Sequence, residues 1–331
     1  TIQIAAGTYV ENLTIRKSLT LVGAGQDQTI VDGNQAGRVL TTDWSGYTIS
    51  VSGMTLRNGR ITSGYGGGVY NEATLTLDHV SILSNTVATV NGDGGGVHNR
   101  WGVITMTHCI VAYNHAEWLG GGVMNDFGTL SITDSTLAYN EAANKGGGLF
   151  NNGGTVLVER VVVHHNQADW AGAGVYNQAQ GKMHLRNVTI SDNTAGSTPG
   201  GLYNDSGGKV LLLNSTVAEN QAQDAPDEIG NYSIFITSTI TITNTIVADG
   251  NSTDNCANVG AYSGNAWVSG GYNLSSDASC SFTQTGDQQN TDPKLGSLGD
   301  NGGPTWTRPL LVGSPAIDAA NNGVCPATAQ R

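Results

Sequence analysis

Six polar residues that could take part in acid–base chemistry or bind a metal recur at one position of an internal repeat. They stand six residues before successive asparagines and are His79, His108, Asp134, Arg160, Asn187 and Asn214. Histidine and carboxylate side chains serve as general acids, general bases and metal ligands. Because outward positions on the flank of a repeat are usually solvated, we expect surface polar groups here and predict no catalytic residue.

The other histidines and acids do not predict a metal site. His164 and His165 are adjacent on a predicted strand, so we expect their side chains to point to opposite faces. The remaining histidines considered are isolated in the sequence: His98, His115 and His184. The run DGNSTD (249–254) resembles a calcium loop but lacks the sixth-position glycine and the later glutamate. We therefore expect no cofactor and no metal, with calcium at that loop as the alternative.

Two tryptophans, each with an acid beside it, are the candidate ligand-binding residues. Glu117 and Trp118 in HAEWLG occupy the same phase of the repeat as Asp169 and Trp170 in QADWAG. Two repeats would separate the pairs by about 10 Å, similar to the spacing of alternate sugars along a glycan, and an exposed indole can stack on a sugar. The plainer alternative is that each tryptophan only covers its own loop.

The elements that must position these residues belong to a repeat of about 26 residues. Its glycine-rich hexamers are GGGVYN (66–71), GGGVHN (94–99), GGGVMN (120–125), GGGLFN (146–151), GAGVYN (172–177) and PGGLYN (199–204). Each hexamer precedes a run of alternating apolar residues, the pattern of a strand with one buried face. Short strands at this period, without helical segments, predict an all-β fold: a single-stranded right-handed parallel β-helix, or solenoid.

Two series of asparagines mark the repeat, one closing the hexamers and one closing the alternating strands. The first is Asn71, Asn99, Asn125, Asn151, Asn177 and Asn204, and the second is Asn85, Asn114, Asn140, Asn166, Asn193 and Asn220. Asparagine tolerates left-handed backbone angles at turns, and stacked amides can bond to one another. We therefore predict two structural ladders through the stacked coils. The glycines should permit a tight turn and close approach of neighbouring coils.

The repeat also sets the predicted organisation of the chain. Residues 1–250 should form the β-helix, with irregular first coils over 1–60 and regular repeats over 61–250. Residues 251–331 should form a loop-rich closing segment packed on the helix.

The net charge of −12, from 14 Lys+Arg against 26 Asp+Glu, argues against nucleic acid as a partner. No run of residues approaches the roughly 20 apolar residues of a membrane span.

The four cysteines suggest one disulfide. Cys256 and Cys280 lie in a polar, glycine-rich segment, where a loop-closing disulfide would suit an oxidising compartment. Cys109 lies within an alternating run and is expected to be a buried free thiol. Cys325 is left without a predicted partner.

Three parts of the sequence resemble exported bacterial proteins. The opening TIQIAAGTYVENLTIRKSLTLVGAGQDQTIVDG resembles the first coils of pectin-lyase-like β-helix proteins, and GGGVYN with STLAYNEA resembles polymorphic outer-membrane-protein-type repeats. The closing NTDPKLGSLGDNGGPTWTRPLLVGSPAIDAANNGVCP is similar to the C-terminal region of the choice-of-anchor Q family. Members of that family usually continue to a C-D-I-G-A-x-E phrase, whereas Ala329 stands where an acid is expected. The resemblance implies an exported protein, extracellular or at the cell surface.

Repeat regularity, few charges and this resemblance favour a non-catalytic extracellular scaffold or adhesin. Free backbone groups at the coil ends would let chains stack end to end into a surface layer or filament, so we expect self-association. The alternatives are a polysaccharide lyase or hydrolase, for which this fold is a frequent host, and a module that binds cell-surface glycans without turnover. Whether the chain is an enzyme stays open, with a non-enzymatic role favoured.

Overall fold

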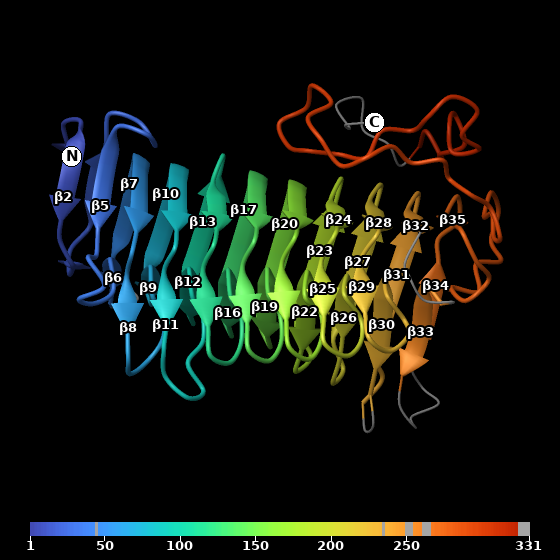
Figure 1. Ribbon diagram of the computed structural model, residues 1–331, viewed down its shortest axis with the longest axis horizontal. Coiled ribbons are helices and arrows are strands. Elements are labelled where there is room, and N and C mark those ends of the chain that lie inside the picture. The colour runs from blue at the N-terminus through green and yellow to red at the C-terminus, as the bar shows by residue number, and fades with distance from the viewer. Residues whose placement is uncertain (44–45, 234–235, 249–253, 260–265, 324–331) are drawn as a thin grey trace.

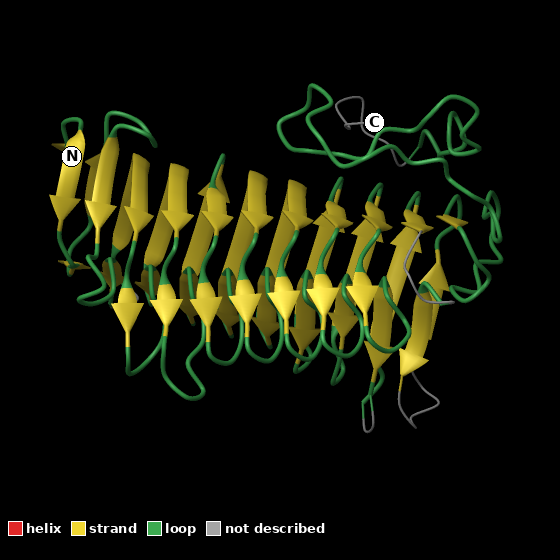
Figure 2. Cartoon of the chain, viewed as in Figure 1, coloured by secondary structure: helices red, strands yellow, loops and turns green. Residues whose placement is uncertain are grey.

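The computed structural model describes residues 1–43, 46–233, 236–248, 254–259 and 266–323 as one stack of coils (Figure 1). Figure 2 shows that the coils consist of strands and loops, and no described residue lies in a helix. Strands of successive coils pair in parallel. This pairing confirms the predicted parallel β-helix. Over the same residues there is accordingly no helix that could cross a membrane.

The strands stack into three sheets of 18, 10 and 7 strands, which we call sheets A, B and C. Sheet A contains β1 (Ile2–Gln3), β2 (Gly7–Val10), β4 (Leu19–Val22), β5 (Thr29–Asp32), β7 (Thr48–Arg57), β10 (Thr74–Leu83), β13 (Val103–Thr107), β14 (Ile110–Ala112), β17 (Thr129–Ala138), β20 (Thr155–His164), β23 (Lys182–Arg186), β24 (Thr189–Ser191), β27 (Lys209–Leu213), β28 (Thr216–Ala218), β31 (Thr239–Thr243), β32 (Ile246–Ala248), β34 (Ala266–Ser269) and β35 (Leu274–Ser275).

Sheets B and C consist of short strands. Sheet B contains β3 (Leu13–Ile15), β6 (Leu40–Thr42), β9 (Val69–Asn71), β12 (Val97–Arg100), β16 (Val123–Asp126), β19 (Leu149–Asn152), β22 (Val175–Gln178), β26 (Leu202–Asn204), β30 (Ile229–Tyr232) and β33 (Cys256–Val259). Sheet C contains β8 (Arg60–Ile61), β11 (Thr86–Val87), β15 (His115–Ala116), β18 (Glu141–Ala142), β21 (Gln167–Ala168), β25 (Thr194–Ala195) and β29 (Gln221–Ala222).

One coil passes through the three sheets in turn, as the order β16, β17, β18 shows. Alternate residues of β17 point inward, so Leu130, Ile132 and Leu137 are buried in the core that runs through the stack. The register places Leu130 over Val156 and Ile132 over Val158 in the next coil. The apolar alternation seen in the sequence therefore builds a continuous interior.

Both asparagine ladders form as predicted, and their side chains are buried. In the first, each amide donates to the amide oxygen one coil further on, from Asn71 through to Asn258, at 2.8 to 3.3 Å. In the second, the same bonds run from Asn85 to Asn220 at 2.8 to 3.0 Å. The carboxylate of Glu228 then accepts bonds from Asn220, and burial raises the pKa of Glu228 well above its ordinary value.

The left-handed backbone expected at the ladder asparagines lies at other residues. Positive φ occurs directly before the second ladder, for example 59° at Tyr113, 54° at Tyr139 and 52° at His165. Because that residue takes up the turn, the following asparagine can point inward and keep its amide in the ladder. The glycine prediction holds: Gly120 has a φ of 64°, and a Cβ on Gly122 would lie 2.6 Å from the carbonyl oxygen of Gly148 in the next coil.

A second apolar layer lies outside the helix, on the outer face of sheet B. It is formed by the fifth residue of each hexamer, and Met124, Phe150, Tyr176 and Tyr203 are buried there. The rings of Phe150 and Tyr176 stack with centroids 4.9 Å apart. The loops between sheet C and sheet B must therefore cover this face.

The stack continues past the predicted boundary at residue 250. The strands β33, β34 and β35 pair with β30, β31 and β32, so a further coil follows that boundary. The side-chain repeat fades there, but backbone pairing does not require it, so this coil could not be predicted from the repeat.

Cys256 and Cys280 are joined by a disulfide across this coil, whereas Cys325 lies outside the described residues. Cys109 is a buried free thiol, and burial raises its pKa to about 12.

Candidate ligand-binding face

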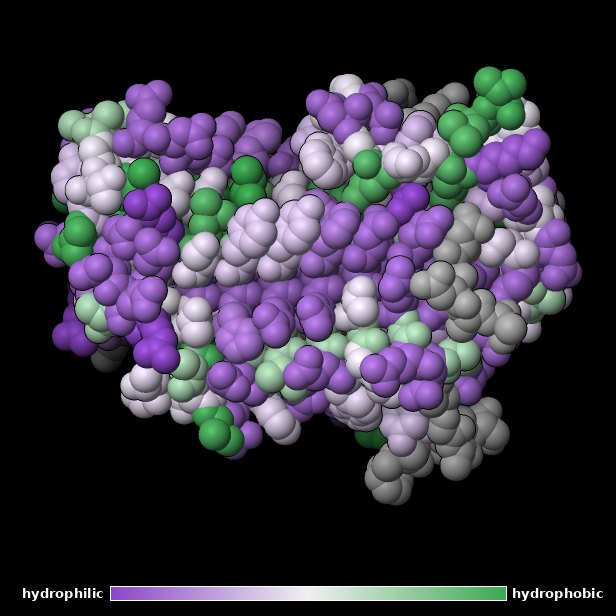
Figure 3. Space-filling view, in the orientation of Figure 1, coloured by the Kyte–Doolittle hydropathy of each residue, from purple (hydrophilic) through white to green (hydrophobic). Residues whose placement is uncertain are grey.

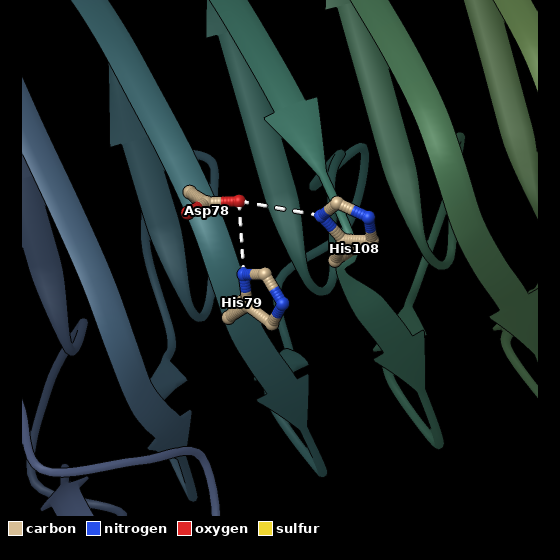
Figure 4. A group of neighbouring side chains, drawn as sticks. All are labelled: Asp78, His79 and His108. Atoms are coloured by element: carbon tan, nitrogen blue, oxygen red, sulfur yellow. Dashed lines mark hydrogen bonds and ion pairs between the residues drawn. The ribbon is translucent and has the colours of Figure 1, made fainter. Parts of the chain in front are cut away.

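The polar column lies on the outer face of sheet A, where each coil bends. Its residues have left-handed backbone angles, from 48° at Asp134 to 54° at Asn187, and so interrupt the strand alternation. Arg160 donates two bonds to the Asp134 carboxylate, at 2.7 and 2.9 Å, and a third to Glu159. These acids are thus engaged in ion pairs. At the N-terminal end of the column, Asp78, His79 and His108 point toward one another (Figure 4).

The two adjacent histidines do not point to opposite faces, and that prediction is wrong. Their Nδ1 atoms lie 2.9 Å apart, because the φ of 52° at His165 turns its side chain back toward His164. Burial and the neighbouring His165 lower the pKa of His164 to about 4.

The histidines described as isolated have distinct surroundings. His98 is buried between the rings of Tyr65 and Tyr70, and burial lowers its pKa to about 3. His115 lies 3.5 Å from both Glu117 and Glu141, through different ring nitrogens. Of the proposed calcium loop, only Asp254 lies within the described residues.

The predicted pair of tryptophans lies on the loops that cover sheet B. Lys145, in the coil between them, accepts a bond from Gly120 and donates its backbone N–H to Trp118, and it bridges to Ala171 beside Trp170. The pairs are therefore in phase and two coils apart. Trp118 is 41% exposed and Trp170 is 46% exposed. The Lys145 ammonium lies 4.1 Å from the centroid of the Trp170 ring, so one face of that indole is already engaged.

An aromatic strip, which we define as Tyr113, Tyr139, His165 and Trp306, lies on another side of the helix. Tyr113 and Tyr139 stack with centroids 5.0 Å apart and are 60% and 42% exposed. Tyr139 contacts the His165 ring, and Trp306 of the C-terminal segment stacks on His164 beside it. Trp306 is itself 45% exposed, so the strip presents partly exposed aromatic rings to solvent.

The C-terminal segment is fastened to the helix next to this strip. The Arg308 guanidinium binds both oxygens of Asp192, at 2.9 and 2.8 Å, and donates to Ser191 at 2.6 Å. Nη2 donates to both Asp192 oxygens and Nε donates to Ser191, and these largely buried contacts fix the position of the segment. In Figure 3 the segment stands as a ridge above a continuous band of hydrophilic side chains along the helix.

A pocket of about 670 Å³ lies between the C-terminal segment and the outer face of sheet A. The helix contributes Asn214, Thr216, Asn244 and Tyr272 to its lining, and the segment contributes Asn301, Thr307, Arg308 and Asp318. Its volume falls within the range of small-molecule sites. Arg308 lines the pocket and binds Asp192, which stands directly before a ladder asparagine as Tyr139 and His165 do, so the pocket and the strip lie along one side of the stack.

Neither the strip nor the pocket is among the features predicted from the sequence. A signal for the strip exists, because Tyr113 and Tyr139 stand at the same position of successive repeats, directly before a ladder asparagine. No comparable signal exists for the pocket, since Arg308 lines it from outside the repeat and is held there by Asp192, 116 residues earlier in the chain.

No protein-family model matches the chain, and no curated protein matches it. Two solved structures are similar to it. Pectate lyase Pel9A has a TM-score of 0.47 and 12% identity, covering 79% of this chain and 70% of its own. The A-module of the Azotobacter vinelandii mannuronan C-5 epimerase AlgE6 has a TM-score of 0.30 and 12% identity, covering 82% of this chain and 88% of its own. Likenesses this distant assign neither substrate nor site residues.

Proposed function

We propose that this protein binds a glycan along the outer face of sheet A without turning it over, as an extracellular adhesive β-helix. The observation that carries the proposal is the pocket of about 670 Å³ on the same side of the stack as the aromatic strip. A linear ligand could place one end in the pocket and extend past Trp306 toward Tyr139 and Tyr113.

The pocket lining suits a ligand rich in hydroxyl groups. Asn214, Asn244 and Asn301 bring amide groups to the lining, where they also bond to one another and to the C-terminal segment, and Thr216 adds a hydroxyl. The Tyr272 ring and Leu274 supply apolar surface for the faces of a sugar. Mixed amides, hydroxyls and one aromatic ring favour a carbohydrate over a phosphate or a lipid.

The charge pattern favours binding over cleavage. Glycoside hydrolysis commonly uses two carboxyl groups that flank the bond, and Asp318 is the only carboxylate among the described residues that line the pocket. Arg308 is engaged by Asp192, and Asp134 by Arg160. The described lining of this pocket therefore lacks the pair of carboxyl groups that a hydrolase commonly uses.

A glycan array with the purified chain, followed by titration of the best ligand, tests the proposal. We expect Trp306→Ala and Tyr139→Asn to weaken binding at least tenfold, since each removes an aromatic contact and asparagine accepts the backbone at residue 139. Trp118→Ala and Trp170→Ala serve as the matched control. Loss of binding only in the control pair would overturn this site in favour of the sheet B loops, and release of shortened or unsaturated sugars would establish an enzyme instead.

An extracellular location and end-to-end association remain proposals. The Cys256–Cys280 disulfide supports an oxidising compartment. Stacking of coil ends would pair their free backbone groups, and electron microscopy at high protein concentration would distinguish filaments from dispersed chains.

A further inference from the structure

A carboxylate and two imidazoles converge at the N-terminal end of the polar column. The Asp78 Oδ1 atom lies 3.0 Å from His79 Nδ1 and 3.5 Å from His108 Nδ1 (Figure 4). The possible ligand atoms of the three residues all lie within 4.8 Å of one another. Both imidazoles therefore direct the same type of nitrogen toward one oxygen.

The backbone holds this arrangement before any ligand binds. His79 and His108 occupy equivalent positions of successive coils, with φ of 50° and 52°, and their rings stack 4.4 Å apart. Asp78 lies in β10 opposite Thr107, immediately before the bend. Gln26, from a loop of an earlier coil, donates to the His108 carbonyl and helps to fix its place.

We propose that Asp78, His79 and His108 form a binding site for a divalent first-row transition metal of the zinc class. Zinc binds imidazole nitrogen and carboxylate oxygen at about 2.0 to 2.2 Å, so ligand atoms around it lie roughly 3.3 Å apart. The observed separations of 3.0 and 3.5 Å bracket that value. An ion there would be bound by the lone pairs of the two Nδ1 atoms, which requires both imidazoles to be deprotonated at Nδ1.

The surroundings accommodate such an ion and leave it accessible. The three side chains are between 46% and 56% exposed, so water or a ligand can complete the coordination. The next member of the column, Asp134, is bound by Arg160. The positive charge of that guanidinium is therefore compensated and opposes a bound cation less. Two nitrogens and one oxygen favour zinc, nickel or copper over calcium, which prefers oxygen ligands.

Calorimetric titration of the metal-free chain with Zn²⁺ tests the site. The substitutions copy residues found at the same positions of other coils: His79→Asn and His108→Asn follow Asn187, and Asp78→Ser follows Ser52. They should therefore preserve the backbone, which unchanged thermal unfolding without metal would verify. His184→Gln, on an exposed outer position of sheet A, is the matched control.

We expect one Zn²⁺ per chain, at least thirtyfold weaker binding in each histidine variant, and less than a twofold change in the control. Co²⁺ bound to the wild-type chain should give visible absorption that disappears in the same variants, and excess Ca²⁺ should not displace it. Unchanged Zn²⁺ binding in His79→Asn and His108→Asn, or no saturable binding to the wild-type chain, would overturn the site. The result is independent of glycan binding, since the metal alone is the probe.

Discussion

The first asparagine ladder, inside the stack, and the outer polar column both repeat once per coil. The ladder keeps the same residue type from coil to coil, and the outer column does not. The first ladder is asparagine from Asn71 to Asn258, whereas the outer column changes from His79 through Asp134 and Arg160 to Asn214. Both columns have a fixed backbone. The ladder must also satisfy buried amides on both sides, while the outer column must satisfy only its left-handed angle.

This difference separates the residues that build the stack from those free to acquire a function. A buried ladder position admits few side chains, because an unpaired polar partner would remain in the neighbouring coil. An outer position can change with little effect on the coils above and below. The candidate metal residues and the aromatic strip both lie at such positions.

Breaking the first asparagine ladder should have the largest effect on the free energy of unfolding. Asn151→Ala removes bonds at 2.8 Å to Asn125 and Asn177 and one at 3.0 Å to Gly154, so the buried amides of both neighbours lose a ladder bond. We expect a loss of about 4 kcal/mol in the free energy of unfolding, measured by chemical denaturation. Asn144→Ala, in a loop of the preceding coil, is the control and should change it by less than about 0.5 kcal/mol. A loss below about 1 kcal/mol at residue 151 would remove the distinction between the columns.

His164, an outer position that the C-terminal segment covers, should make an intermediate and pH-dependent contribution to the free energy of unfolding. The pKa of His164 is lowered to about 4, so between pH 6.5 and 4 the unfolded chain takes up a proton that the folded chain does not. This contribution to stability is complete above about pH 6.5 and is lost as the pH falls toward 4. We expect about 2 kcal/mol of it to be lost by pH 5.

Unfolding of the wild-type chain and of His164→Ser at pH 8 and pH 5 would measure this effect. Serine occupies the same outer row at Ser191, so the backbone should tolerate it. The variant loses the Trp306 contact at both pH values but should lose less stability between them than the wild-type chain. Equal pH dependence in the two proteins would contradict the assignment to His164.

The ion pair between Asp134 and Arg160, on the outer column, should contribute least to the stability of the fold. Asp134→Asn removes the charge that binds Arg160 and keeps a residue suited to the φ of 48°. We expect a loss of about 1 kcal/mol that diminishes in high salt, measured by thermal unfolding at two ionic strengths. An effect as large as that of Asn151→Ala would show that the outer column also holds the stack together.

The sequence by itself determined the period, the parallel stacking, the inward alternation and both asparagine ladders. These features depend on contacts between equivalent residues of adjacent coils, so a repeat in the sequence is also a repeat in space. The glycines of each hexamer were predictable for the same reason, because every coil meets the next one at the same point.

The tertiary structure alone decided which outer residues meet. The φ of 52° at His165 turned two adjacent histidines toward each other, and a similar bend joined Asp78 to His79 and His108. Trp306 and Arg308 reached their partners through a segment that returns along the finished stack. Local alternation predicts side-chain direction only while the strand is regular, and contacts made after the repeat ends have no period to reveal them.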